Sequence, residues 1–234
     1  AVRPEGDASF VDGGKFKDPG VYYKNPQLIN EYAYLWLNRN GSPTRLTDHI
    51  YDMLWDGSRL TSGERMYIYA RHLAMLTEYW RAHRKVAGVL HFCGLAYSRP
   101  EEPRGYTSDN FADIPNLTFE PEFYKYVKPA FSPVGLMVDV WEKDYPAEAK
   151  ITVPVYVIND LKTGFEQDVV LTIWQKDRMV STDKKTVSVK GYEVEVISFE
   201  ITLPGDPGEY QLKAEIKVND DVVFSLRDIP VRNL

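Results

Sequence analysis

The second half of the sequence alternates apolar and polar residues with a period of two. In the clearest run, Tyr210, Leu212, Ala214, Ile216 and Val218 alternate with polar residues from Gln211 to Lys217. Successive side chains of a β-strand point to opposite faces, so such a run predicts a strand with one buried face. Further runs of this kind occupy residues 136–141, 151–158, 169–174, 186–189, 192–203 and 222–226.

These short runs follow one another over about one hundred residues, with Gly, Pro or Asp between them. That spacing is typical of an immunoglobulin-like antiparallel β-sandwich, which we place at residues 134–234. The pair Asn219-Asp220 predicts a tight turn into the last strand. Cys93 is the one cysteine of the chain, so the sandwich would be of the kind that lacks a disulfide.

The first half shows helical spacing and two short apolar runs. Residues 27–29 predict a strand, and Val86–Phe92 is an apolar run without alternation, which is typical of a strand buried on both faces. Between them, apolar residues recur every three or four positions from Thr61 to Arg84, which predicts a long helix. This order predicts a βαβ unit. Shorter helices are expected at Thr47–Trp55 and Glu122–Phe131, so the fold class is α+β.

Composition and missing motifs exclude several functions. The net charge is −6 and the pI is about 5.3, which argues against a general nucleic-acid binder. No window contains the roughly 20 apolar residues of a membrane span. The four histidines show no metal-ligand spacing, and no phosphate loop or serine-hydrolase elbow is present. We therefore expect no metal and no cofactor.

One carboxylate, Glu31, directly follows the first predicted strand. Aromatic and amide side chains surround it in the sequence, and others follow the second predicted strand. Sugar C–H faces stack on aromatic rings while sugar hydroxyls need polar partners, so these residue types favour a carbohydrate site. The candidate substrate-binding residues are Asn30, Tyr32, Trp36, Phe92 and Tyr97.

An ordered series of motifs resembles the end of the catalytic barrel of glycoside hydrolase family 2, which includes β-galactosidases and β-glucuronidases. The series runs from Asn30-Glu31-Tyr32-Ala33 through the long helix to Ala87–Phe92. The segment from Glu120 to Phe131 resembles the last barrel helix, and Pro133-Val134-Gly135-Leu136 resembles the entry to the immunoglobulin-like domain that follows the barrel in many members. The resemblance covers about residues 25 to 160 and implies that residues 1–133 are the C-terminal part of a TIM barrel.

The resemblance implies a role for Glu31 as the nucleophile of a retaining mechanism, which forms a covalent glycosyl-enzyme. Phe92 stands where the family usually has a tryptophan, so stacking is kept and the indole N–H is lost. We also expect Tyr32 to hydrogen-bond Glu31 and to lower its basicity.

A retaining mechanism also needs a second carboxylate as acid/base. In the family that glutamate lies on an upstream barrel strand, and residues 1–133 are about half the length of a barrel. The chain is therefore expected to be a C-terminal fragment of a retaining β-glycosidase that is inactive alone. It would associate with the missing N-terminal barrel half or with itself. The resemblance favours a periplasmic or secreted location. The alternatives are a non-catalytic carbohydrate-binding module and a protein-interaction module.

Overall fold

The computed structural model describes residues 28–55, 59–84, 86–95 and 105–233, and it gives the backbone of a short antiparallel pair, β1 (Val11–Asp12) and β2 (Lys15–Phe16). The described chain forms two compact units. The helical unit contains the described residues up to Trp80 and those from Val86 to Lys128. The sandwich unit contains Arg81–Arg84 and the residues from Pro129 onward.

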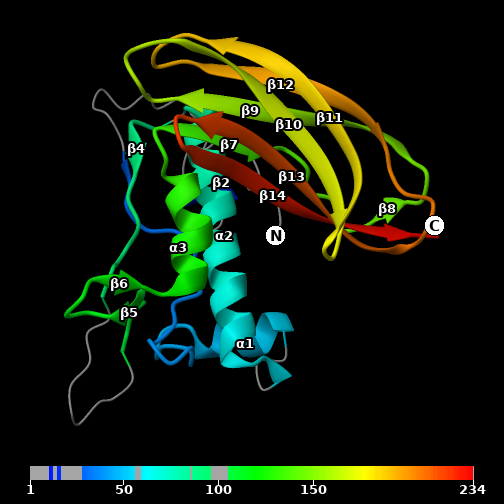
Figure 1. Cartoon of the computed structure of the whole chain (residues 1–234). Helices are drawn as coiled ribbons and strands as arrows, with labels where there is room; N and C mark the ends of the chain where they lie inside the picture. The colour runs from blue at the N-terminus through cyan, green and yellow to red at the C-terminus, as the bar shows by residue number, and fades with distance from the viewer. Residues whose placement is uncertain are drawn as a thin grey trace. The chain divides into compact units, whose positions relative to one another are not determined.

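The sandwich unit consists of two sheets that share one core. One sheet has the strand order β11-β10-β13-β14-β8, and the other has the order β12-β9-β7 (Figure 1). All neighbours pair antiparallel except β14 and β8, which are parallel. The strands are β7 (Val134–Val138), β8 (Tyr145–Pro146), β9 (Lys150–Asn159), β10 (Phe165–Gln175), β11 (Arg178–Val189), β12 (Val194–Thr202), β13 (Gly208–Val218) and β14 (Asp221–Arg232).

The period-two pattern predicts this half of the chain well. Tyr210, Leu212, Ala214 and Ile216 are all buried in the core between the sheets. Val218 pairs with Asp221 across a two-residue turn, in which Asn219 has a φ of 55°. Each predicted run overlaps a strand, and the prediction of antiparallel strands is confirmed.

Strand β11 is the main departure, because it begins at Arg178 rather than at residue 186. It is the edge strand of its sheet, and among the described residues it pairs with β10 alone. Most of its side chains are exposed, so its first part needs no apolar alternation and the sequence pattern does not reveal it.

The helical unit is built around a βαβ arrangement. Its elements are β3 (Leu28–Ile29), α1 (Asp48–Trp55), α2 (Ser62–His83), β4 (Gly88–Val89), β5 (Phe111–Asp113), β6 (Thr118–Phe119) and α3 (Pro121–Ala130), of which the ends of α2 and α3 belong to the sandwich unit. Strands β3 and β4 are parallel, and the N–H of Leu90 donates to the carbonyl of Ile29 over 2.8 Å. The predicted strand–helix–strand order and the three predicted helices are confirmed.

The prediction that Val86–Phe92 is a strand buried on both faces is wrong. Only Gly88–Val89 joins the ladder, and the side chains of Leu90 and Phe92 are 54% and 38% exposed. The described sheet contains β3 and β4 alone, so no neighbouring strand covers its edges. This two-stranded sheet does not show a barrel segment.

Helix α2 begins with a reciprocal pair of hydrogen bonds. The Glu64 N–H donates to Thr61 Oγ1 over 3.2 Å, and the Thr61 N–H donates to Glu64 Oε2 over 2.7 Å. These bonds satisfy two backbone donors at the helix start. The two donors of Thr61, its N–H and its hydroxyl, hold the pKa of Glu64 below its usual value.

Replacing Thr61 by alanine is expected to lower the free energy of unfolding by about 1 kcal/mol, because one N–H at the helix start loses its acceptor. Urea unfolding followed by circular dichroism measures this change. Ser62→Ala is the matched control, since it removes a neighbouring exposed hydroxyl while keeping the Cβ. An equal loss in both variants would contradict the capping role.

Candidate functional site

Glu31 lies just beyond the carboxyl end of β3, and its side chain is exposed. Since β3 and β4 are parallel, their carboxyl ends lie at the same end of the sheet, and the segments that follow both strands begin there. The hydroxyl of Tyr34 donates to Glu31 Oε2 over 3.3 Å. Partial burial, and after it the negative charge of Glu31, raise the pKa of Tyr34. Tyr34 therefore remains a protonated donor at neutral pH.

Aromatic rings adjoin this carboxylate. The ring of Trp36 lies edge-on to Tyr34 with 5.1 Å between centroids, and it lies 5.7 Å from the ring of Phe92, which follows β4. The buried Nε1–H of Trp36 has no hydrogen-bond partner in the described part of the chain. We call Glu31, Tyr34, Trp36 and Phe92 the strand-end cluster. It combines a carboxylate, a hydroxyl donor and partly exposed aromatic surface.

The other predicted site residues are placed differently. Asn30 is exposed and adjoins Glu31 in the chain, whereas Tyr97 falls outside the described residues. Tyr32 is buried in the core of the helical unit, and its hydroxyl lies 2.7 Å from Thr77 Oγ1. The structure therefore pairs Tyr32 with Thr77, and Tyr34 is the tyrosine that donates to Glu31.

The backbone at Ala33 explains why the two tyrosines differ. Ala33 has a φ of 57°, a left-handed conformation that non-glycine residues seldom adopt. The N–H of Leu35 donates to the carbonyl of Ala33 over 2.7 Å, which closes a tight turn. Tyr32 and Tyr34 therefore do not share a face as they would in a strand. No residue pattern predicts a left-handed conformation at an alanine. The sequence therefore does not predict that Tyr34 is the tyrosine that donates to Glu31.

A polar network holds the chain that follows β4. The hydroxyl of Tyr69 lies 2.9 Å from His91 Nε2. Ser108 Oγ and Asn110 Nδ2 both donate to the carbonyl of Cys93, over 2.9 and 3.2 Å. Burial raises the pKa of Tyr69 and lowers the pKa of His91 to about 4. The network is therefore neutral at pH 7, and it fixes the segment that presents Phe92.

The half-buried His91 makes the free energy of unfolding depend on pH. The pKa of His91 in the folded chain, about 4, lies below its ordinary value of 6.5, so the unfolded chain takes up this proton first as the pH falls. The stabilisation of the fold by neutral His91 is fully present above pH 6.5 and is lost as the pH falls from 6.5 to 4. The expected loss is on the order of 2–3 kcal/mol. His72, whose pKa burial also lowers to about 4, contributes in the same direction.

Urea unfolding at a series of pH values tests this expectation. His91→Gln keeps a hydrogen-bonding side chain that does not titrate, so its stability should fall less than that of the natural chain between pH 6.5 and 4. His49→Gln is the control, because His49 is largely exposed. If His91→Gln and the natural chain had parallel pH profiles, the assigned role of His91 would be wrong.

Within the described ranges, no group of three or more His, Cys, Asp or Glu residues is arranged to hold a metal ion. No helix in the described part of the chain is long and apolar enough to cross a membrane.

Comparisons with known proteins give partial structural likenesses. No protein-family model and no curated protein matches the chain. A cycloisomaltooligosaccharide glucanotransferase from Paenibacillus sp. is 19% identical with a TM-score of 0.33, covering 42% of this chain and 14% of that one. A glycoside hydrolase family 2 β-glucuronidase is 17% identical with a TM-score of 0.33, covering 43% and 11%. A CARDB domain from Pyrococcus furiosus is 17% identical with a TM-score of 0.36, covering 44% and 96%.

The chain thus spans about a seventh or less of the length of the two enzymes. The partial neighbours include glycoside hydrolases, but these TM-scores assign no family. The strand-end cluster is therefore the feature of the chain that points to a function.

Proposed function

We propose that this chain is the C-terminal part of a retaining β-glycosidase of the glycoside hydrolase family 2 type. Residues 1–133 would supply the last part of the catalytic barrel. The observation that carries the proposal is the position of Glu31, which is exposed just beyond the carboxyl end of β3. A hydrogen bond to Tyr34 and ring contacts through Trp36 connect it with Phe92, which follows the parallel strand β4. In parallel barrels, catalytic side chains come from the carboxyl ends of the strands.

The strand-end cluster suits the chemistry of the proposed reaction. Glu31 is the nucleophile that attacks the anomeric carbon and forms the covalent glycosyl-enzyme. Tyr34 donates to Glu31 and orients its carboxylate. Phe92 offers a partly exposed ring to a sugar face, and Asn30 offers an amide to a hydroxyl. The substrate class is a β-glycoside.

We infer further that residues 134–234 form an immunoglobulin-like domain. The strand order supports this, because the chain passes from one sheet to the other between β9 and β10, returns between β11 and β12, and passes over again between β12 and β13. Strands β10, β13 and β14 lie side by side in one sheet, and β7, β9 and β12 lie in the other. Immunoglobulin-type sandwiches distribute their strands between two sheets in a comparable way.

The proposal requires residues beyond this chain. A retaining enzyme needs an acid/base carboxylate about 5 Å from the nucleophile, which the family resemblance places on an upstream strand. The sheet of the helical unit has exposed apolar side chains at Leu28 and Leu90, and such a sheet is prone to associate. We therefore expect this chain to be inactive alone and to pack against an N-terminal barrel half, in a periplasmic or secreted enzyme.

The first test is to read the coding sequence upstream of Ala1. The proposal expects an open frame of several hundred codons that contains a strand ending in Asn-Glu. A frame that begins close to Ala1 would overturn the catalytic proposal and favour a non-catalytic carbohydrate-binding or protein-interaction module.

A further inference from the structure

Strand β12 forms an open edge of the sandwich unit. It pairs on one side with β9, and in the described chain no strand pairs with its other side. Bonds at both ends fix the direction of its backbone groups: the carbonyl of Glu193 accepts from Asn159, and the N–H of Leu203 donates to Ala149. Odd-numbered residues therefore face β9, and the backbone groups of Ser198, Glu200 and Thr202 point away from the sheet.

One of these outward groups is covered from the neighbouring sheet. Lys185 of β11 reaches across, and its Nζ donates to the carbonyl of Ser198 over 2.6 Å. Lysine on or near an edge strand is a common protection against unwanted pairing. Strand β12 itself contains neither proline nor lysine. From Glu200 to Thr202 the edge therefore lacks the protection that Lys185 gives at Ser198.

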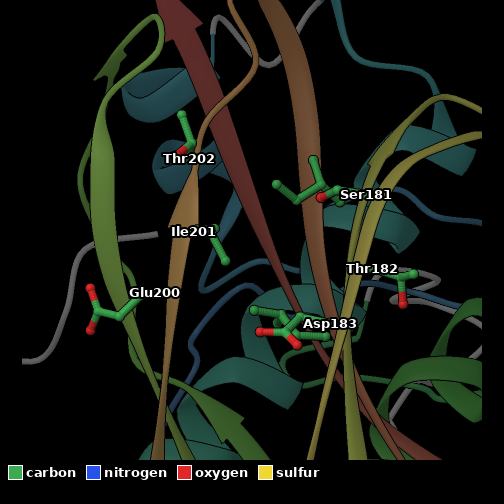
Figure 2. Close-up of a pocket in the computed structure, with 8 residues that line it drawn as sticks. Ser181, Thr182, Asp183, Glu200, Ile201 and Thr202 are labelled. Carbon is green, nitrogen blue, oxygen red and sulfur yellow. The ribbon is translucent and has the colours of Figure 1, made fainter.

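A cavity of about 250 Å³ opens between β11 and β12 at this end. Leu171, Ile173 and Ile201 give it apolar walls. Figure 2 shows Ser181 and Asp183 extending from β11 toward β12. Glu200 lines it from β12, and its carboxylate accepts from Thr152 Oγ1 over 2.8 Å.

We propose that β12 and this cavity bind an extended, basic peptide segment of a partner protein. The segment adds to the sheet as a further strand, and its backbone bonds the outward groups of Glu200 and Thr202. A lysine or arginine of the segment enters the cavity. Its aliphatic stem lies against Leu171 and Ile173, and its charged end pairs with Asp183.

The negative charge of β12 and the cavity indicates that the bound segment is basic. Strand β12 carries Glu195 and Glu200 and has no basic residue, and Asp183 adds a third carboxylate at the cavity. Lys185 is held at the Ser198 carbonyl, and Lys184 pairs with Asp168 over 2.8 Å. A second copy of the chain would bring two acidic strands into one ribbon, which like-charge repulsion opposes. A basic strand brings the complementary charge.

The test measures binding of fluorescent peptides of about nine residues to the whole 234-residue chain by fluorescence anisotropy. The probe alternates valine and lysine. Asp183→Asn is expected to weaken binding about tenfold, while Glu166→Gln, which removes an exposed carboxylate on β10, leaves it unchanged. Thermal unfolding of each variant controls for folding.

Two further measurements separate strand addition from simple charge attraction. N-methylation of alternate peptide residues should abolish binding in one register only, because only one set of N–H groups faces β12. Lys185→Met should tighten binding several-fold by freeing the Ser198 carbonyl. Equal binding of a peptide with glutamate in place of lysine would overturn the proposal, as would insensitivity to N-methylation. Sedimentation that shows a dimer dissociated by Glu200→Pro would overturn it in favour of a second copy.

Discussion

Replacing Glu31 by glutamine in the longer enzyme that we propose is expected to lower kcat on a β-glycoside by on the order of 1,000-fold or more. The amide of glutamine is nearly isosteric with the carboxylate, but it cannot form the covalent glycosyl-enzyme. Since Glu31 is exposed and Tyr34 is the partner that donates to it, the exchange should leave the fold intact. Initial rates and thermal unfolding of the purified enzyme measure both effects.

A matched control and a rescue experiment sharpen this prediction. Asp52→Asn removes another exposed carboxylate of the helical unit, on α1, and should leave kcat unchanged. In Glu31→Ala, added azide should enter the space left by the carboxylate and attack the same face of the sugar. The product would then be the α-glycosyl azide, with inverted configuration. An unchanged kcat in Glu31→Gln would refute the nucleophile assignment.

Burial determines how much of the sandwich unit the sequence predicts. Strand β13 has one face in the core, so every second residue from Tyr210 to Ile216 must be apolar and the strand is evident. The first part of β11 has no buried face, and its start at Arg178 depends on pairing with distant β10 residues. Such pairing leaves no local pattern to read.

Where the structure places a predicted site residue differently from the sequence pattern, the cause is local. Glu31 and Phe92 lie beyond the ends of the two parallel strands, and ring contacts connect the neighbourhood of Glu31 with Phe92. Tyr32 is adjacent to Glu31 in the sequence, which favours a contact between them, but the left-handed turn at Ala33 places Tyr32 in the core. The apolar run Val86–Phe92 suggested a covered strand, although apolarity cannot tell which segment covers it.

Arg81 is a largely buried cation of the sandwich unit that bonds two carbonyls and one carboxylate. It lies in the last turn of α2 and donates to the carbonyls of Ala130 and Ser132, the latter over 2.6 Å. It also pairs with Asp160 Oδ2 over 2.7 Å, and its side chain is only 10% exposed. Arg84 pairs with the other oxygen of Asp160 over 2.8 Å but is 39% exposed. The two arginines thus share one carboxylate and differ in burial.

Replacing Arg81 by methionine is expected to lower the free energy of unfolding of the sandwich unit by about 3 kcal/mol. Methionine keeps most of the aliphatic stem, but two carbonyls lose their donor and Asp160 loses its more buried partner. Arg84→Met should cost less than about 1 kcal/mol, because solvent screens the more exposed pair. Urea unfolding of both variants and of Asp160→Asn measures these values. If Arg81→Met and Asp160→Asn lost equal amounts, the carboxylate would account for the whole effect. A larger loss in Arg81→Met would show that the carbonyl bonds contribute the difference.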